Sequence, residues 1–193
     1  SSGDEIWVKA GTYSGPVTLK NGVKIIGGFA GTETTASQSD PVTNGTIIDG
    51  GGADRAVLSE DCAASTMLRG FTIQNGNDTG DDGGGGALVK NSAPFFVECT
   101  FKNNKASRFG AAVGVRGSSS PQFVNCAFHD HGTGSGTGAT PLGRGAVFVY
   151  SGTATFTNCL FRDNKAGEGG AIALGSGSAT LANCTVADNE ALI

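Results

Sequence analysis

The stretch FTNCLFRDN at residues 156–164 decides the fold, because the chain repeats it at short and similar intervals. Aligned copies read LRGFTIQNG at 68–76, FVECTFKNN at 96–104, FVNCAFHDH at 123–131 and LANCTVADN at 181–189. In the first copy, Phe71 stands where the other four have a cysteine. A repeat of about this length is typical of a solenoid, in which each repeat packs only on its neighbours.

Each copy contains the alternation that marks a strand with one buried face. In the copy at 156–164, we expect Phe156, Cys159 and Phe161 to point inward. The residue before the cysteine is usually Asn or Gly, which tolerate the left-handed backbone of a sharp corner, and Glu98 is the exception. A second polar corner follows each copy, and a Gly-Ala pair then opens another apolar run. The pattern predicts three short strands and three corners in each repeat.

The short period determines how these strands are connected. The cysteines follow one another after 27, 33 and 25 residues, which leaves no room for a helix in each turn. Strands that coil in this way pair with their equivalents in the next turn. We therefore predict an all-β protein, a right-handed parallel β-helix with three short strands per turn, in which Phe101, Phe128 and Phe161 stack. A leucine-rich-repeat solenoid would need leucine-dominated strands, which the chain lacks.

The cysteine position defines an inward column, which we call the cysteine column. Its members are Phe71, Cys99, Cys126, Cys159 and Cys184. We expect its thiols to be buried and reduced, because free cysteine packs like a small apolar residue and a bridge between turns would strain the ladder. Zinc-type C-x-x-C spacing is absent from the sequence. Cys62 lies outside the column, and we expect it to be an unpaired thiol in a corner.

The first third of the chain is less regular but is expected to share this architecture. Strands are predicted at 5–8, 17–19, 23–26 and 46–49, between runs of Gly, Pro, Asn and Ser. We predict one domain over residues 1–193, with less regular turns at 1–66 and regular repeats at 67–193. Because neither end carries a recognisable cap, we expect the chain to be a segment of a longer protein.

Composition limits the classes of partner. The 193 residues include 17 acidic and 13 basic side chains, for a net charge of −4. We expect no nucleic-acid partner, since such partners need a basic surface that displaces phosphate counterions. The sequence also has no apolar run of the length that spans a bilayer, so no membrane-spanning segment is predicted.

Several motifs resemble those of known bacterial surface proteins. GGAI at 169–172, with FKNN at 101–104 and FRDN at 161–164, resembles the paired motifs of the chlamydial polymorphic outer-membrane proteins. GDEIWVKAGTY at 3–13, GGFAGTE at 27–33 and IIDG at 47–50 are similar to the start of large secreted proteins with right-handed parallel β-helix repeats, in the pectin-lyase-like superfamily. This resemblance implies a longer parent with a signal peptide and a surface anchor. Its members include adhesins, surface-layer components and polysaccharide-degrading enzymes, so it implies the fold more than the function.

A glycine-rich loop at 75–83 is a candidate calcium site. It carries Asp78, Asp81 and Asp82 beside two asparagines, and oxygen ligands of this kind are those that Ca²⁺ prefers. Calcium is the one cofactor that the sequence suggests. The loop matches neither an EF-hand nor a repeated calcium nonapeptide, and a solvated polar loop is the alternative.

Basic residues suggest a second candidate site. Lys102, His129 and Arg162 lie three positions after successive cysteines, so they should form an outward row spaced by about 5 Å. The acidic loop and the insertion at 131–143 leave the coil at one corner, two turns apart, and should enclose a notch lined by Lys105 and Arg108. Row and notch together would suit an acidic sugar chain. A solvated face and a mobile insertion are the alternatives.

These candidate groups are dispersed over several turns, which disfavours acid–base catalysis. We therefore expect a non-catalytic stalk or adhesin segment of a bacterial surface protein, secreted or at the cell surface, with carbohydrate or other surface proteins as partners. Two alternatives remain. A polysaccharide-active enzyme of the lyase type predicts an acid, a base and a metal gathered around one sugar. A self-assembling surface filament predicts end-to-end association of copies.

Overall fold

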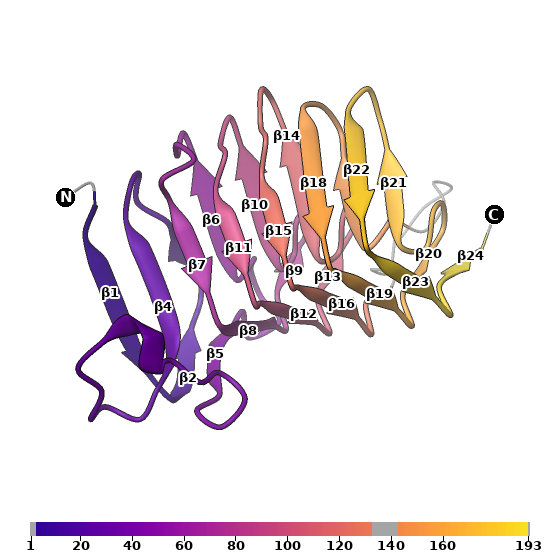
Figure 1. The fold of residues 1–193 in the computed structure, drawn as a ribbon. Helices are drawn as coiled ribbons and strands as arrows, with labels where there is room; N and C mark the ends of the chain where they lie inside the picture. The colour runs from indigo at the N-terminus through magenta and orange to yellow at the C-terminus, as the bar shows by residue number, and fades with distance from the viewer. Residues whose placement is uncertain (1–2, 133–142, 193) are drawn as a thin grey trace.

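The computed structural model describes residues 3–132 and 143–192, which form a coil of parallel strands stacked turn upon turn (Figure 1). Each full turn contributes one strand to each of three parallel sheets, which we name A, B and C. The only helix of the described residues is the short 3-10 helix η1 (Ala36–Gln38), and none of them forms a helix long and apolar enough to cross a membrane. The predicted all-β coil with three strands per turn is confirmed.

The three sheets run along the whole coil from the indigo to the yellow end of Figure 1. Sheet A consists of β1 (Glu5–Lys9), β4 (Lys24–Phe29), β7 (Met67–Arg69), β11 (Phe95–Val97), β15 (Gln122–Val124), β18 (Thr153–Thr157) and β22 (Ser178–Ala182). Sheet B consists of β2 (Gly11–Ser14), β5 (Thr46–Asp49), β8 (Phe71–Gln74), β12 (Thr100–Lys102), β16 (Ala127–His129), β19 (Leu160–Arg162) and β23 (Thr185–Ala187). Sheet C consists of β3 (Val17–Thr18), β6 (Val57–Glu60), β10 (Ala87–Lys90), β14 (Val113–Arg116), β17 (Val147–Val149) and β21 (Ile172–Leu174).

Two short strand pairs link sheets B and C at one corner. They are β9 (Asn77–Asp78) with β13 (Lys105–Ala106), and β20 (Lys165–Ala166) with β24 (Glu190–Ala191). The strands at 11–14 and 57–60 were not predicted, because their alternation is short and interrupted by glycine and serine.

Left-handed residues make the corners, as the repeat predicts. Between sheets A and B the corner residue has a φ of 52–54° in four successive turns and 73° in the glycine that precedes them. These residues are Gly70, Glu98, Asn125, Asn158 and Asn183. Sheet B ends at a second set of left-handed residues, namely Asn75, Asn103, Asp130, Asp163 and Asp188. Glu98 therefore keeps the backbone conformation of its column although its side chain differs.

The core is a stack of aromatic rings and thiols. Phe128 lies 5.0 Å from Phe101 and 4.7 Å from Phe161, ring centre to ring centre, with the planes within 9° of parallel. A second stack of Phe96, Phe123 and Phe156 meets the first edge to face. All five cysteines are free, and the cysteine column is buried except for Cys184, which is partly buried. Each thiol of the column donates to main-chain carbonyls of its own turn and of the turn before it.

Candidate functional site

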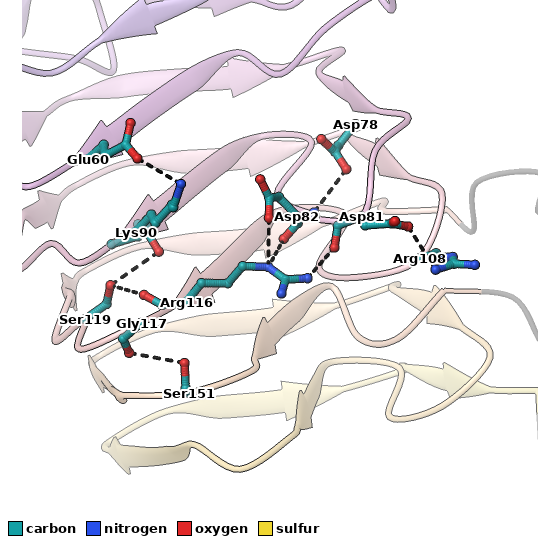
Figure 2. Close-up of polar contacts among 12 residues, drawn as sticks. Glu60, Asp78, Asp81, Asp82, Lys90, Arg108, Arg116, Gly117, Ser119 and Ser151 are labelled. Carbon is teal, nitrogen blue, oxygen red and sulfur yellow. Dashed lines mark hydrogen bonds and ion pairs between the residues drawn. The ribbon is translucent and has the colours of Figure 1, made fainter.

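The carboxylates of the acidic loop pair with three different arginines rather than with one centre. Figure 2 shows two of these arginines, Arg108 beside Asp81 and Arg116 beside Asp82. The pairs are Asp78 with Arg55 at 2.6 Å, Asp81 with Arg108 at 2.8 Å, and Asp82 with Arg116 at 3.7 Å. Asp78 is buried, and burial raises its pKa while the charge of Arg55 opposes that shift. Within residues 3–132 and 143–192, no three His, Cys, Asp or Glu side chains gather closely enough to hold a metal ion. Calcium binding by this loop stays a prediction.

The acidic loop folds back over the outer face of sheet C. The Arg116 guanidinium donates to the backbone carbonyls of Asp81 and Asp82, as Figure 2 shows. That guanidinium also lies over two aromatic rings, 5.4 Å from the centre of Phe109 and 4.8 Å from that of Tyr150. Gly114 in β14 permits the loop to approach the sheet closely, since a Cβ there would lie 2.9 Å from the Gly84 nitrogen. The loop is thus clamped to β14, and Arg108 is engaged with it rather than free in a notch.

The basic row exists in the expected register but is largely neutralised. Lys102, His129 and Arg162 are direct neighbours across β12, β16 and β19. His129 Nδ1 lies 2.6 Å from a carboxylate oxygen of Asp130, and Arg162 pairs in the same way with Asp163. The hydrogen bond from His129 lowers the pKa of Asp130. Each carboxylate directly follows its partner in the chain, a local signal that the prediction of a bare basic row did not use.

Lys102 and Lys105 differ from most of the cations in having no carboxylate partner among the described residues. All six arginines are paired: Arg55, Arg69, Arg108, Arg116, Arg144 and Arg162. Lys9 and Lys20 are also unpaired within the described part, but they lie apart from each other in the first turn. Lys102 and Lys105 stand on either side of the corner pair Asn103 and Asn104, so two uncompensated lysines lie within four residues of the chain.

A pocket of about 370 Å³ opens beside Lys105, and we call it the lysine pocket. Its lining residues are Gly51, Gly52, Asn75, Gly76, Asn77, Asn103 and Lys105. The amide nitrogen of Asn75 donates to Asp49, and that of Asn77 donates to the Gly52 carbonyl. The side chain of Asn103 has no hydrogen-bond partner among the described residues. The pocket therefore offers one ammonium and several amide groups to a polar ligand.

The lysine pocket is a different hollow from the expected notch, although both include Lys105. It is walled by the turn at 51–52, on the side of Lys105 away from the insertion at 131–143. Positions 133–142 of that insertion lie outside the described residues, so its contribution to a notch stays a prediction. Lys165 holds the equivalent corner position in β20, and Glu190 neutralises it at 2.9 Å. Of the two corner lysines, only Lys105 lacks such a partner.

A second hollow of about 420 Å³ was not predicted. We call it the insertion groove after the segment 39–46, which is distinct from the insertion at 131–143. Residues 39–46 form one wall, and the corner between sheets A and B forms the floor. The wall is tied to β4, since Asp40 N donates to the Gly28 carbonyl and Ser39 Oγ to the Gly27 carbonyl. Asp40 in turn accepts hydrogen bonds from residues 42 and 43, and the side-chain bond from Thr43 is the main cause of its lowered pKa.

Glu98 lines this groove in a strained conformation. Its φ is 52°, and it is the only residue other than Gly, Asn or Asp that adopts a positive φ among the described residues. Left-handed backbone costs most side chains about 1–2 kcal/mol, whereas Asn tolerates it through local hydrogen bonds. Glu98 pairs with Arg69 at 2.9 Å, with both side chains partly exposed. Exposed pairs contribute only about 0.2–1 kcal/mol, so the ion pair does not fully offset the strain.

Comparison with protein families identifies the coil. A family model described as a right-handed β-helix region matches residues 21–192, which is most of the chain. The chain belongs to the right-handed β-helix family. This membership agrees with the resemblance to pectin-lyase-like repeat proteins and with the parallel sheets of the structure. A search of curated proteins and a search of solved structures each found no match. The function must therefore be argued from the surface of this β-helix.

Proposed function

We propose that this β-helix is a non-catalytic, extracellular stalk or adhesin segment of a bacterial surface protein, and that it binds acidic carbohydrate at the lysine pocket. The observation that carries the proposal is the uncompensated charge of Lys105 in a pocket lined by amides, with the equally unpaired Lys102 three residues before it in the chain. A sugar carboxylate would meet the ammonium of Lys105, and amide groups would meet neighbouring hydroxyls. The resemblance to secreted β-helix proteins supports the extracellular location.

The arrangement of charges favours binding over catalysis. Acid–base catalysis needs its groups within about 3 Å of the reacting atom or one water away. His129 and Arg162 are held by Asp130 and Asp163. His129 lies one turn, about 4.8 Å, along the coil from Lys102, and Arg162 lies one turn beyond His129. The lysine pocket has no carboxylate among its lining residues. A ligand held there would meet a cation and amides, with no acid–base pair at its glycosidic bond.

Binding of polygalacturonate, alginate and hyaluronan fragments, measured by calorimetry, tests the proposal. The Lys102→Ala/Lys105→Ala variant should bind at least tenfold more weakly than the unchanged protein. The matched control is Lys9→Ala/Lys20→Ala, which removes the same charge from unpaired lysines elsewhere and should bind normally. Equal losses in both variants would reduce the interaction to non-specific attraction, which salt screens, and would refute the pocket.

The same fragments also test the two alternatives. Release of unsaturated products or new reducing ends that disappears in Lys105→Ala would establish the polysaccharide-active enzyme. The filament alternative predicts that copies of the chain associate end to end. Sedimentation velocity over a concentration series separates it, since a filament subunit would grow into long species and a stalk segment would not.

A further inference from the structure

We infer that the insertion groove is a second binding site of this β-helix, and that its ligand is an uncharged oligosaccharide. The site lies at a different corner from the lysine pocket and does not depend on it. The residues that carry the inference are Asp40, Val42, Arg69, Thr72, Glu98 and Thr100, all of which line the groove.

The inference starts from two departures from the repeat that meet in one place. At the left-handed corner the following turns have asparagine, and only this turn has Glu98. In the outward row of sheet A, the next two turns have Val97 and Val124, whereas the turn that lines the groove has Arg69. Both charged residues face the same groove and pair with each other. The repeat itself therefore shows which residues the fold alone would accept at both positions.

Stability does not account for the pair. A glutamate in left-handed backbone is strained, and an ion pair that solvent reaches is weak. Asparagine and valine would fill the two positions without strain and without loss of buried contacts. Strain of this kind persists at sites where the side chain serves a ligand, and the argument here runs from the observed outlier to that function.

The polar groups of the groove fit hydroxyls better than charges. Within the described residues, one oxygen of Glu98, the terminal nitrogens of Arg69, and the hydroxyls of Thr72 and Thr100 have no hydrogen-bond partner. Sugar hydroxyls both donate and accept, so they can satisfy this mixture. Arg69 and Glu98 cancel in charge, and Asp40 leaves the groove slightly negative. An acidic sugar would be repelled, whereas an uncharged one would not.

The groove is also formed before any ligand arrives. Its wall is fixed to β4 by the hydrogen bonds of Ser39 and Asp40, so binding need not order a loop. Val42 stands at the rim with 94 % of its surface exposed and offers an apolar contact to a sugar face. Thr72 and Thr100 are direct neighbours in sheet B, one turn apart, so their hydroxyls repeat along the coil axis at about 4.8 Å. An extended sugar chain lying along the axis would meet both.

Calorimetric titration with cellohexaose, xylohexaose and mannohexaose, with hexagalacturonate as the charged comparison, tests the inference. At least one uncharged hexamer should bind. Glu98→Asn and Arg69→Val should each weaken that binding at least tenfold, while their melting temperatures stay equal to or above that of the unchanged protein. The control Thr157→Val changes the same outward row of sheet A away from the groove and should bind normally.

Three results would overturn the inference. One is that none of the uncharged hexamers binds. Another is that Glu98→Asn and Arg69→Val bind like the control. The third is a marked drop in melting temperature in Glu98→Asn, which would make Glu98 a structural residue whose strain the fold requires. Because the lysine pocket takes a charged ligand, loss of hexagalacturonate binding alone would bear on that pocket and not on the groove.

Discussion

Replacing His131 by asparagine should stabilise the β-helix, because His131 interrupts an asparagine ladder. Asn104, Asn164 and Asn189 hold the equivalent positions, and each amide donates to a main-chain carbonyl of the turn before it at 2.9 Å. His131 is fully buried. Its Nδ1 accepts the backbone N–H of Asn104, whereas its Nε2 has no hydrogen-bond partner among residues 3–132 and 143–192. An asparagine at this position would still accept the Asn104 N–H through its side-chain oxygen. Its side-chain nitrogen would also donate to a main-chain carbonyl of the preceding turn, as the other three asparagines do.

The expected gain can be worked from these contacts. A buried polar group without a partner costs about 1–3 kcal/mol, and a restored hydrogen bond recovers most of that amount. The smaller side chain leaves a small void that removes part of the gain. We expect His131→Asn to raise the free energy of unfolding by about 1–2 kcal/mol near neutral pH.

The gain should grow in acid, because burial lowers the pKa of His131 to about 4 from the 6.5 of an exposed histidine. Between these two values the unfolded chain binds a proton that the folded chain rejects, so stability is full above pH 6.5 and falls as the pH drops toward 4. For the unchanged protein this loss reaches about 2 kcal/mol by about pH 5. His131→Asn lacks the group and should lose that much less.

Urea unfolding followed by circular dichroism at about pH 7.5 and about pH 5 measures both effects. The control is His129→Gln, which places in the outward row the residue type that Gln74 already supplies there. It should retain the acid loss that His131 causes. A His131→Asn protein that is less stable at neutral pH, or one with the same acid loss as the unchanged protein, would refute the account of the ladder.

The remaining predictions concern the core, the acidic loop and the thiols. Phe128→Ala should cost about 3–5 kcal/mol in urea unfolding, because two stacked turns cannot close over the cavity, and a cost below about 1 kcal/mol would contradict the ring stack. If the acidic loop binds calcium, saturation at a hundred times the dissociation constant should add about 2.7 kcal/mol, and Asp81→Asn/Asp82→Asn should abolish the shift in melting temperature. No shift in either protein would remove the site. Thiol titration of the native protein should find Cys126 protected, and rapid labelling would mean that the column is open.

The sequence alone was sufficient for the parts of the fold that repeat. Inward positions such as Phe101 and Cys126 recur in every turn, so alternation identified them. The corner asparagines recur as well, and their left-handed backbone follows from residue type. The burial of Asn104 was not foreseen, because both residues of each corner pair are polar and only the three-dimensional coil shows that the second one points inward.

The candidate sites were harder to predict, because they depend on contacts between turns whose corner lengths vary. Glu98 was recognised as an exception in its column, yet nothing in the sequence joins it to Arg69 or to the wall at 39–46. That wall occurs once, so no repeat reports its path. The ion pair of Asp78 with Arg55 likewise links residues 23 positions apart across an irregular corner. Neither contact leaves a periodic signal.

The return of the chain to register after the insertion has a consequence for how such proteins change over time. Arg144 bridges Phe109 on one side and Glu168 on the other, so the ladder resumes directly after positions 133–142. Each turn of the coil contacts only the turns next to it, so the number of residues at one corner does not affect the pairing of more distant turns. Corners can therefore lengthen, shorten and acquire new binding residues one at a time, while the stacked core remains untouched.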